Sequence, residues 1–536
     1  MPSVNHLLCG LAANENLPSS LLDRLIAVAD AEVADHLADR ADLSRAQAVA
    51  LAARVEESGV PLACRGRLTA ADVDPVARPD VALALLDTGA APAAWARLLA
   101  ADPVVEHREK LAACPGLPPD VVETLAADPE IRVVAEAALW APARVAARLA
   151  AHPHAEVRRM AAANEATPPS VLEALVTGDG LPAARHCLGC DRRTPPFAHD
   201  PHGPRPDRDL PPWASCDGAH ASTTHDLLYA ALRNPTTPAG ALVGFVDHPS
   251  HLLRRALAAR RDLPPPVYEL LASDPDPGVR AGLAENPAIG DALIRALADD
   301  DCHDVRRGPA HHPGVPLDVL TRLARGTRIG ATLLPRIAAA ASLAEVEALA
   351  GSSDPAARML VAQRRDLPAE IRDALATDPD AKVVKSVAPH PGLEESQLRA
   401  LAGRHGARVI AGIAANPDAT PALLAELARH EPPVRKALRL IAGHHNATAP
   451  ALLACLDDDE ARPVAARHPA LPQSVVTDLV AGADLRSAEA AAANPSLPHT
   501  VMTEFLPPPP VRAGSPGGDA EPAALGPPRG RDRRTR

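Results

Sequence analysis

The chain has 536 residues and a net charge of −12, and 47% of its residues are hydrophobic although only 1% are aromatic. This acidity disfavours a protein that coats nucleic acid, because neutralising phosphates requires a concentrated positive surface. With so few aromatic rings, the core must be built from Ala, Leu and Val, which suits thin layers of short helices.

The cysteine content and the N-terminal residues indicate a cytoplasmic protein without membrane contact. Eight cysteines are too sparse for a disulfide scaffold. Residues 1–10 lack the pattern of a signal peptide, and no segment has the apolar length of a membrane span. Only four of the 55 basic residues are lysine, which is typical of a GC-rich bacterial genome.

Prolines recur at a fixed interval along most of the chain. They stand at positions 92, 118, 142, 168, 238, 264, 316, 368, 421, 472 and 498, and their spacing is 24 to 27 residues or about twice that, except for the 70 residues between 168 and 238. The frame persists where proline is absent, since Leu43-Ser44 lies one period after Leu17-Pro18. Proline is favourable at a helix start, so the spacing predicts roughly eighteen tandem repeats of about 26 residues.

Each repeat is expected to contain two short helices. After the proline, apolar residues fall on one face of a helix, as in Val475, Val476, Leu479 and Val480. A second helix is expected to start at Asp-Pro pairs such as Asp274-Pro275, where Asp caps the helix and Pro takes its first position. This second helix carries a Val-Arg pair and ends at Asn-Pro or His-Pro. Such units stack, so we predict an all-α solenoid.

Two polar ladders recur at fixed phase. Arginines stand ten residues before the proline slot, at Arg132, Arg158, Arg254, Arg280, Arg306, Arg358 and Arg462, and asparagines stand four before it, at Asn14, Asn164, Asn234, Asn286 and Asn494. We interpret both as structural, with Arg donating to carbonyls or to the Asp of the next repeat and Asn capping a turn. The alternative is a periodic surface that binds an acidic peptide or a phosphate backbone. His152, His312, His390 and His468 are interpreted as substitute caps.

The unit Leu263-Pro264, Val267, Leu270-Leu271-Ala272, Asp274-Pro275-Asp276, Val279-Arg280, Leu283-Ala284, Asn286-Pro287 resembles the leucine-rich repeat variant family of bacterial HEAT-like helical repeats. The resemblance extends from about residue 10 to about residue 508. It implies a right-handed superhelix of alternating α- and 3₁₀-helices with little or no β-structure. Members of this family are known with an iron–sulfur cluster held by a separate group of cysteines.

One repeat is interrupted, and the chain therefore divides into four parts. Residues 1–178 form N-terminal repeats, 179–224 an insertion rich in Cys, His and Pro, 225–508 repeats that continue the same solenoid, and 509–536 a tail of Pro, Gly and charge that we expect to be disordered. The insertion is expected between a helix ending near Val176 and one resuming near His225.

The insertion contains the clearest candidate for chemistry. Cys187-x-x-Cys190 and Cys216-x-x-x-His220 have the ligand types of a closed zinc site, although another histidine could be the fourth ligand. The alternatives are an iron–sulfur cluster, for which the insertion offers only three cysteines, a redox dithiol, and a loop without metal.

No nucleotide-binding loop, zinc-protease helix or nucleophile elbow is visible, so we expect no enzymatic activity. The leading hypothesis is an interaction scaffold that binds a protein or peptide on the concave face of the solenoid. Alternatives are a nucleic-acid-binding repeat protein and a metal- or iron–sulfur-dependent redox protein. A continuous positive inner face would favour nucleic acid, and a mixed or acidic one would count against it.

Overall fold

The computed structural model describes residues 2–182, 184–187, 221–326, 333–339 and 341–507. These residues form 35 α-helices and four 3₁₀-helices, and their only β-bridge is an isolated one between His154 and His186. The predicted all-α solenoid is confirmed. None of the helices in the described ranges has the length and apolar content needed to cross a bilayer.

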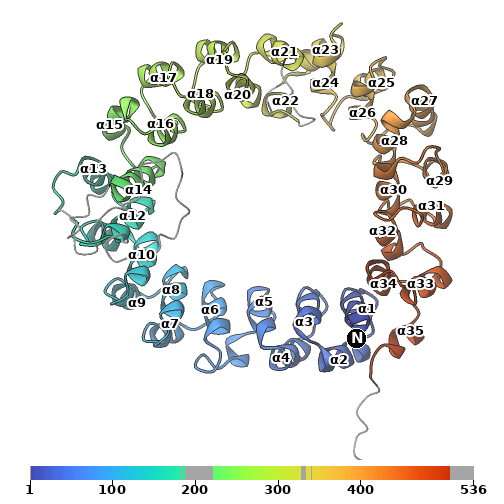
Figure 1. The fold of residues 1–536 in the computed structure, drawn as a ribbon, viewed down its shortest axis with the longest axis horizontal. Coiled ribbons are helices and arrows are strands. Elements are labelled where there is room, and N and C mark those ends of the chain that lie inside the picture. Colours follow the sequence, from blue (N-terminus) through green and yellow to red (C-terminus); the bar gives the residue numbers. More distant parts are fainter. Residues whose placement is uncertain (1, 183, 188–220, 327–332, 340, 508–536) are drawn as a thin grey trace, which may run out of the picture.

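The helices alternate between an inner and an outer layer, except at one place where two successive helices are both inner (Figure 1). The inner layer consists of α1 (Pro2–Ala12), α3 (Ala31–Ala38), α5 (Gly59–Cys64), α6 (Pro79–Asp87), α8 (Val105–Ala113), α10 (Ile131–Trp140), α12 (Ala155–Ala163), α14 (Ala221–Arg233), α16 (His251–Ala258), α18 (Pro277–Ala284), α20 (His303–Arg307), α22 (Pro335–Ala339), α24 (Pro355–Val361), α26 (Ala381–Val387), α28 (Ala407–Ala414), α30 (Arg435–Ala442), α32 (Arg462–Arg467) and α34 (Leu485–Ala492).

The outer layer consists of α2 (Ser19–Val28), α4 (Arg45–Arg54), α7 (Ala93–Leu99), α9 (Pro119–Leu125), α11 (Ala143–Leu149), α13 (Pro169–Thr177), α15 (Ala239–Leu242), α17 (Pro265–Ala272), α19 (Asp291–Ala298), α21 (Leu317–Gly326), α23 (Leu343–Ala350), α25 (Ala369–Ala376), α27 (Glu395–His405), α29 (Pro421–Ala428), α31 (Ala449–Cys455), α33 (Gln473–Val480) and α35 (His499–Glu504). The 3₁₀-helices are η1 (Glu56–Ser58), η2 (Ala70–Asp72), η3 (Val243–Asp247) and η4 (Gly308–His311). Most repeats therefore use two α-helices rather than the α/3₁₀ alternation that the resemblance implies.

The repeated prolines start the outer helices, as predicted. Pro118 has φ −57° and ψ 143° and precedes the first residue of α9, and Pro264 precedes α17 in the same way. Proline is favourable at this place because the N–H groups of the first turn make no hydrogen bonds within the helix, so the lack of one costs nothing.

The inner helices begin two residues later than several of the Asp-Pro pairs suggested. Asp276, not Asp274, caps α18, and its carboxylate accepts the N–H groups of Gly278 and Val279. Asp274 instead accepts the N–H of Asp276 in the preceding turn. At α24 the prediction is correct, because Asp354 is the N-cap and Pro355 the first residue.

The core lies between the two layers. Both helices of a repeat contribute small aliphatic side chains, such as Leu271 from α17 and Val279 and Leu283 from α18, all fully buried. Because a single layer pair cannot bury its apolar face alone, most inner helices also pack against the inner helices before and after them.

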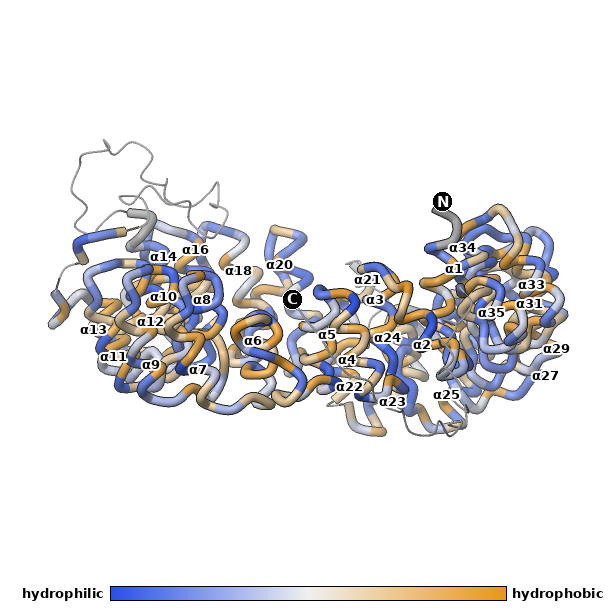
Figure 2. The backbone as a smooth tube through the Cα atoms, turned by 90° about the horizontal axis from the view of Figure 1, so that it is seen from below, coloured by the Kyte–Doolittle hydropathy of each residue, from blue (hydrophilic) through white to orange (hydrophobic). Residues whose placement is uncertain are grey.

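The solenoid closes on itself into a ring, which the sequence did not predict. Figure 1 shows α1 beside α34, and the two helices are in direct contact. Asn14 Nδ2 donates to the carbonyls of Ala492 and Asn494 at 3.0 and 2.7 Å, and Arg24 Nε donates to the carbonyl of Pro507 at 2.8 Å. Seen from the side, the ring is shallow, and polar and apolar stretches alternate all along it (Figure 2). The inner layer of helices thus forms a continuous inner wall.

Candidate binding surface

The asparagine ladder holds successive repeats together. Asn286 Nδ2 donates to the carbonyls of Ala258 and Arg260 in the preceding repeat, at 2.7 and 2.5 Å. Its Oδ1 accepts the N–H of Ala288 at 2.9 Å. The same side chain–backbone contacts are made by Asn14, Asn164, Asn234, Asn416 and Asn494. These amides are buried and saturated, so they do not form a ligand-binding surface.

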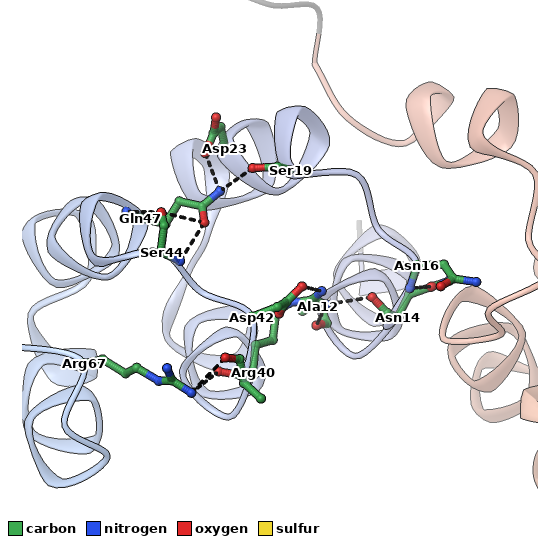
Figure 3. Close-up of polar contacts among 11 residues, drawn as sticks. Ala12, Asn14, Asn16, Ser19, Asp23, Arg40, Asp42, Ser44, Gln47 and Arg67 are labelled. Carbon is green, nitrogen blue, oxygen red and sulfur yellow. Dashed lines mark hydrogen bonds and ion pairs between the residues drawn. The ribbon is translucent and has the colours of Figure 1, made fainter.

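Other residue types occupy the same position with the same geometry. Arg40 donates to the carbonyls of Ala12 and Asn14 at 2.8 and 2.7 Å, and Asp42 holds its guanidinium with two hydrogen bonds (Figure 3). His312 Nε2 lies 2.9 Å from the carbonyl of Asn286, and its Nδ1 accepts a backbone N–H. His444 and His468 repeat this pattern. The predicted role of His312 and His468 as substitute caps is confirmed.

The arginine ladder is structural as well. Arg280 Nη1 donates to the carbonyl of Asp274 at 2.7 Å, and its Nε and Nη2 bind the Asp300 carboxylate of the next repeat at 2.7 and 3.0 Å. The Arg280 guanidinium holds the pKa of Asp300 below its ordinary value. Arg108, Arg254 and Arg358 make the equivalent pairs. Arg132 is an exception, since it is exposed and pairs with Glu106.

Only one of the four predicted metal ligands lies in the described part of the chain. Cys187 is fully buried against Ala155 and Ala184, next to the bridge between His154 and His186. Cys190, Cys216 and His220 lie outside the described residues. The described ranges contain no group of three His, Cys, Asp or Glu side chains that could hold a metal ion. The zinc site and the iron–sulfur alternative therefore stay predictions.

On the N-terminal third of the inner wall, charged side chains are paired from one helix to the next. Lys110 of α8 bonds Asp80 of α6 at 2.8 Å, and Arg132 of α10 pairs with both Glu106 and Glu109 of α8. Burial of the opposite side of these helices against the outer layer directs the exposed charges inward. This part of the wall is mixed to acidic, and its charges neutralise one another.

A different pattern covers the three adjacent helices α26, α28 and α30. We name as the basic arc their exposed cations that form no ion pair, which are Lys382, Lys385, Arg408, Lys436 and Arg439. Arg435, also exposed on α30, is left out because it lies 3.9 Å from the Asp458 carboxylate. The opposite sides of these helices are buried, with Val383, Ile410 and Leu438 in the core. The helices themselves contain no Asp or Glu. Within the described residues, no ion pair engages any of the five cations.

The basic arc was missed at the level of sequence, although a signal was present. Three of the four lysines of the chain fall between residues 382 and 436. Their periodic placement on the inner helices is visible only once the exposed side of those helices is known. The exposed indole of Trp140, at the end of α10, was missed in the same way.

No protein-family model matches this sequence, and a comparison with curated proteins finds no relative.

Proposed function

We propose that the protein is a non-enzymatic interaction scaffold that binds a protein or peptide partner on the inner wall of its ring. The observation that carries this proposal is the basic arc, whose five charged side chains lie on the wall without ion-pair partners among the described residues. Such charges add nothing to the contacts that hold the repeats together, and they are available to a partner of opposite charge.

The wall as a whole supports a protein partner better than a nucleic acid. A nucleic acid threaded through the ring would meet Glu32 and Asp35, both exposed on the inner helix α3, as well as the basic arc. Phosphate binding requires a continuous positive surface, which a mixed wall lacks. The proposal includes a cytoplasmic location, the leucine-rich repeat variant resemblance and a zinc-stabilised insertion.

Site-specific photo-crosslinking tests which face of the ring meets the partner. The reactive residue is placed at Ala281 or Ala411, on inner helices α18 and α28, or at the matched outer positions Ala374 and Ala400, which are exposed on α25 and α27. We expect one recurrent crosslinked protein from the inner positions in cells that express the full chain at native level. Crosslinks that arise mainly from the outer positions, or from none of the four, contradict the proposal.

A further inference from the structure

The five cations of the basic arc are brought together by the repeat itself. Lys385 and Arg439 occupy the same place in their inner helices, and Lys382, Arg408 and Lys436 occupy another, just before the first buried residue. α26 packs on α28, and α28 on α30. Because adjacent helices lie about 8–10 Å apart, the arc presents a grid of positive charge roughly 20 Å long.

No carboxylate of the described residues forms an ion pair with this grid. Asp380 lies at the start of α26, but its carboxylate accepts the N–H of Lys382 as the N-cap. Asp418, which follows α28, accepts the N–H of Gly392 at 2.6 Å. The cations therefore repel one another in the free protein, and an anionic ligand relieves that repulsion on binding.

The chemistry of the arc favours carboxylates over a nucleic acid strand. Single-stranded nucleic acids are held by aromatic side chains that stack on bases as well as by positive charge. α26, α28 and α30 contain no Phe, Tyr or Trp. What the arc offers instead is lysine and arginine beside small aliphatic residues such as Ala411, a surface on which a peptide backbone can lie closely.

We propose that the basic arc is the docking site for an Asp/Glu-rich segment of the partner protein. This inference rests on the proposed function, because it takes the inner wall as the binding face. An extended segment of about six residues spans the arc, and its carboxylates pair with the lysines and arginines of successive helices.

Fluorescence anisotropy with the full-length protein tests the proposal. The probe is a fluorescein-labelled Asp/Glu-rich peptide of about twelve residues, which is long enough to cross three helices. In the arc variant, Lys385→Glu is combined with Arg439→Glu. We expect its affinity for the probe to fall by about tenfold or more, and the affinity of the unaltered protein to fall as salt is raised.

The matched control combines Arg255→Glu with Arg307→Glu. These two exposed arginines occupy the same helix position as Lys385 and Arg439 but lie on α16 and α20, outside the arc. The control changes the net charge by the same amount as the arc variant. Because its residues lie outside the arc, it should retain affinity close to that of the unaltered protein. Circular dichroism of both variants reports whether the ring still folds.

Three outcomes overturn the inference. The first is the absence of peptide binding, and the second is an equal loss of affinity in the arc and control variants. The third is tighter binding of an oligothymidylate of the same charge, with the same sensitivity to the arc variant, which makes the arc a nucleic-acid site. If crosslinking from Ala281 and Ala411 still captures a partner in any of these cases, the scaffold function stands and only the docking site is wrong.

Discussion

At the residue scale, one hydrogen-bonding task is performed by three side-chain types. The ladder position needs a donor to the carbonyls of the preceding repeat, and Asn286, Arg40 and His312 all supply it. Asn and neutral His also accept a backbone N–H two residues further on. For His312 this fixes the tautomer with the proton on Nε2, because Nδ1 must act as the acceptor. A charged imidazole cannot make both contacts.

His390 occupies the same ladder position with poorer contacts, and it makes the ring sensitive to acid. It is 1% exposed, and neither ring nitrogen makes a hydrogen bond of good geometry within the described residues, although backbone groups of Ala362 and Ser386 lie near the ring and oppose the lowering of its pKa. Burial, helped by the Arg365 cation, lowers the pKa of His390 to about 4. The unfolded imidazole, with a pKa of about 6.5, binds a proton first as the pH falls. The stability contributed by neutral His390 in the folded protein is therefore complete above pH 6.5 and is lost between about pH 6.5 and 4.

We expect His390→Asn to stabilise the ring and to reduce this pH dependence. Asparagine restores the amide found at Asn286 and Asn416, and it does not titrate. At about 1.4 kcal/mol for each pH unit, the imidazole accounts for roughly 3 kcal/mol between pH 6.5 and 4. Urea midpoints of both proteins at pH 7 and pH 5 measure the effect. If the urea midpoint falls equally in the two proteins between pH 7 and pH 5, His390 is not the cause of the loss of stability in acid.

The pairing of Arg280 with Asp300 is a second residue-scale contact with a measurable cost. Arg280→Val leaves the Asp300 carboxylate, which is largely buried, without its cation, so we expect a loss of about 2 kcal/mol. Combining Arg280→Val with Asp300→Asn removes the unpaired charge and keeps an acceptor for the Cys302 N–H, so part of the stability should return. The chain supports this coupling, because where Val384 takes the arginine position, the residue in the Asp slot is Arg404. Denaturant midpoints compare the stability of the two variants directly. A double variant that is no more stable than the single variant would argue against the coupling of Arg280 to Asp300.

At the element scale, much of the fold follows from the sequence. The prolines at 118 and 264 start outer helices because of their fixed φ and missing N–H, and the asparagines end inner helices because they cap the following turn. The start of α18 at Pro277 was misplaced by two residues. Both Asp274 and Asp276 accept backbone N–H groups, and only the tertiary pairing of Asp274 with Arg254 distinguishes them.

Closure changes what the removal of a repeat should do. In an open solenoid, deleting residues 265–290 should leave a shorter folded protein, because contacts are made between neighbours. In the ring, we expect the helical signal per residue to be retained. The contact of α1 with α34 should be lost, because with one repeat fewer the solenoid no longer completes the full circle. Hydrogen exchange at α1 and α34 checks this. Deleting 13 residues instead places an outer helix in the inner layer, and it should cost helical signal as well.

At the scale of the whole molecule, the sequence predicted the stacking but not the closure. Ring closure depends on a small rotation added at each repeat, and no individual residue encodes that sum. The contact between α1 and α34, which we call the seam, nevertheless has the sequence found at an ordinary junction between two successive repeats. Gly10, Gly308 and Gly412 each stand four residues before a ladder residue, namely Asn14, His312 and Asn416. The cations of the basic arc are likewise visible in the sequence. That they all lie on the inner wall is known only from the layered arrangement of the helices.

The seam can be broken without touching any other junction. A Cβ at Gly10 would lie 2.2 Å from the carbonyl oxygen of Glu489 and 2.7 Å from Cβ of Ala492, so a larger residue forces α1 away from α34. We expect Gly10→Leu to open the ring, which raises the radius of gyration in solution scattering and the exchange rate at both ends of the chain. Helical content should hardly change, because every other junction is intact.

Two matched variants make this last prediction specific. A Cβ at Gly240 would meet no atom within 4 Å among the described residues, so Gly240→Leu should leave a closed ring. A Cβ at Gly412 would lie 3.1 Å from the carbonyl oxygen of Lys385 and 3.2 Å from Cβ of Ala388, so Gly412→Leu should loosen an internal junction and raise exchange around α26 and α28 instead. If Gly10→Leu scatters like the unaltered protein, the ends are held together by more than the close approach of α1 to α34. If it unfolds the whole chain, the repeats depend on closure, and the solenoid is stable only as a ring.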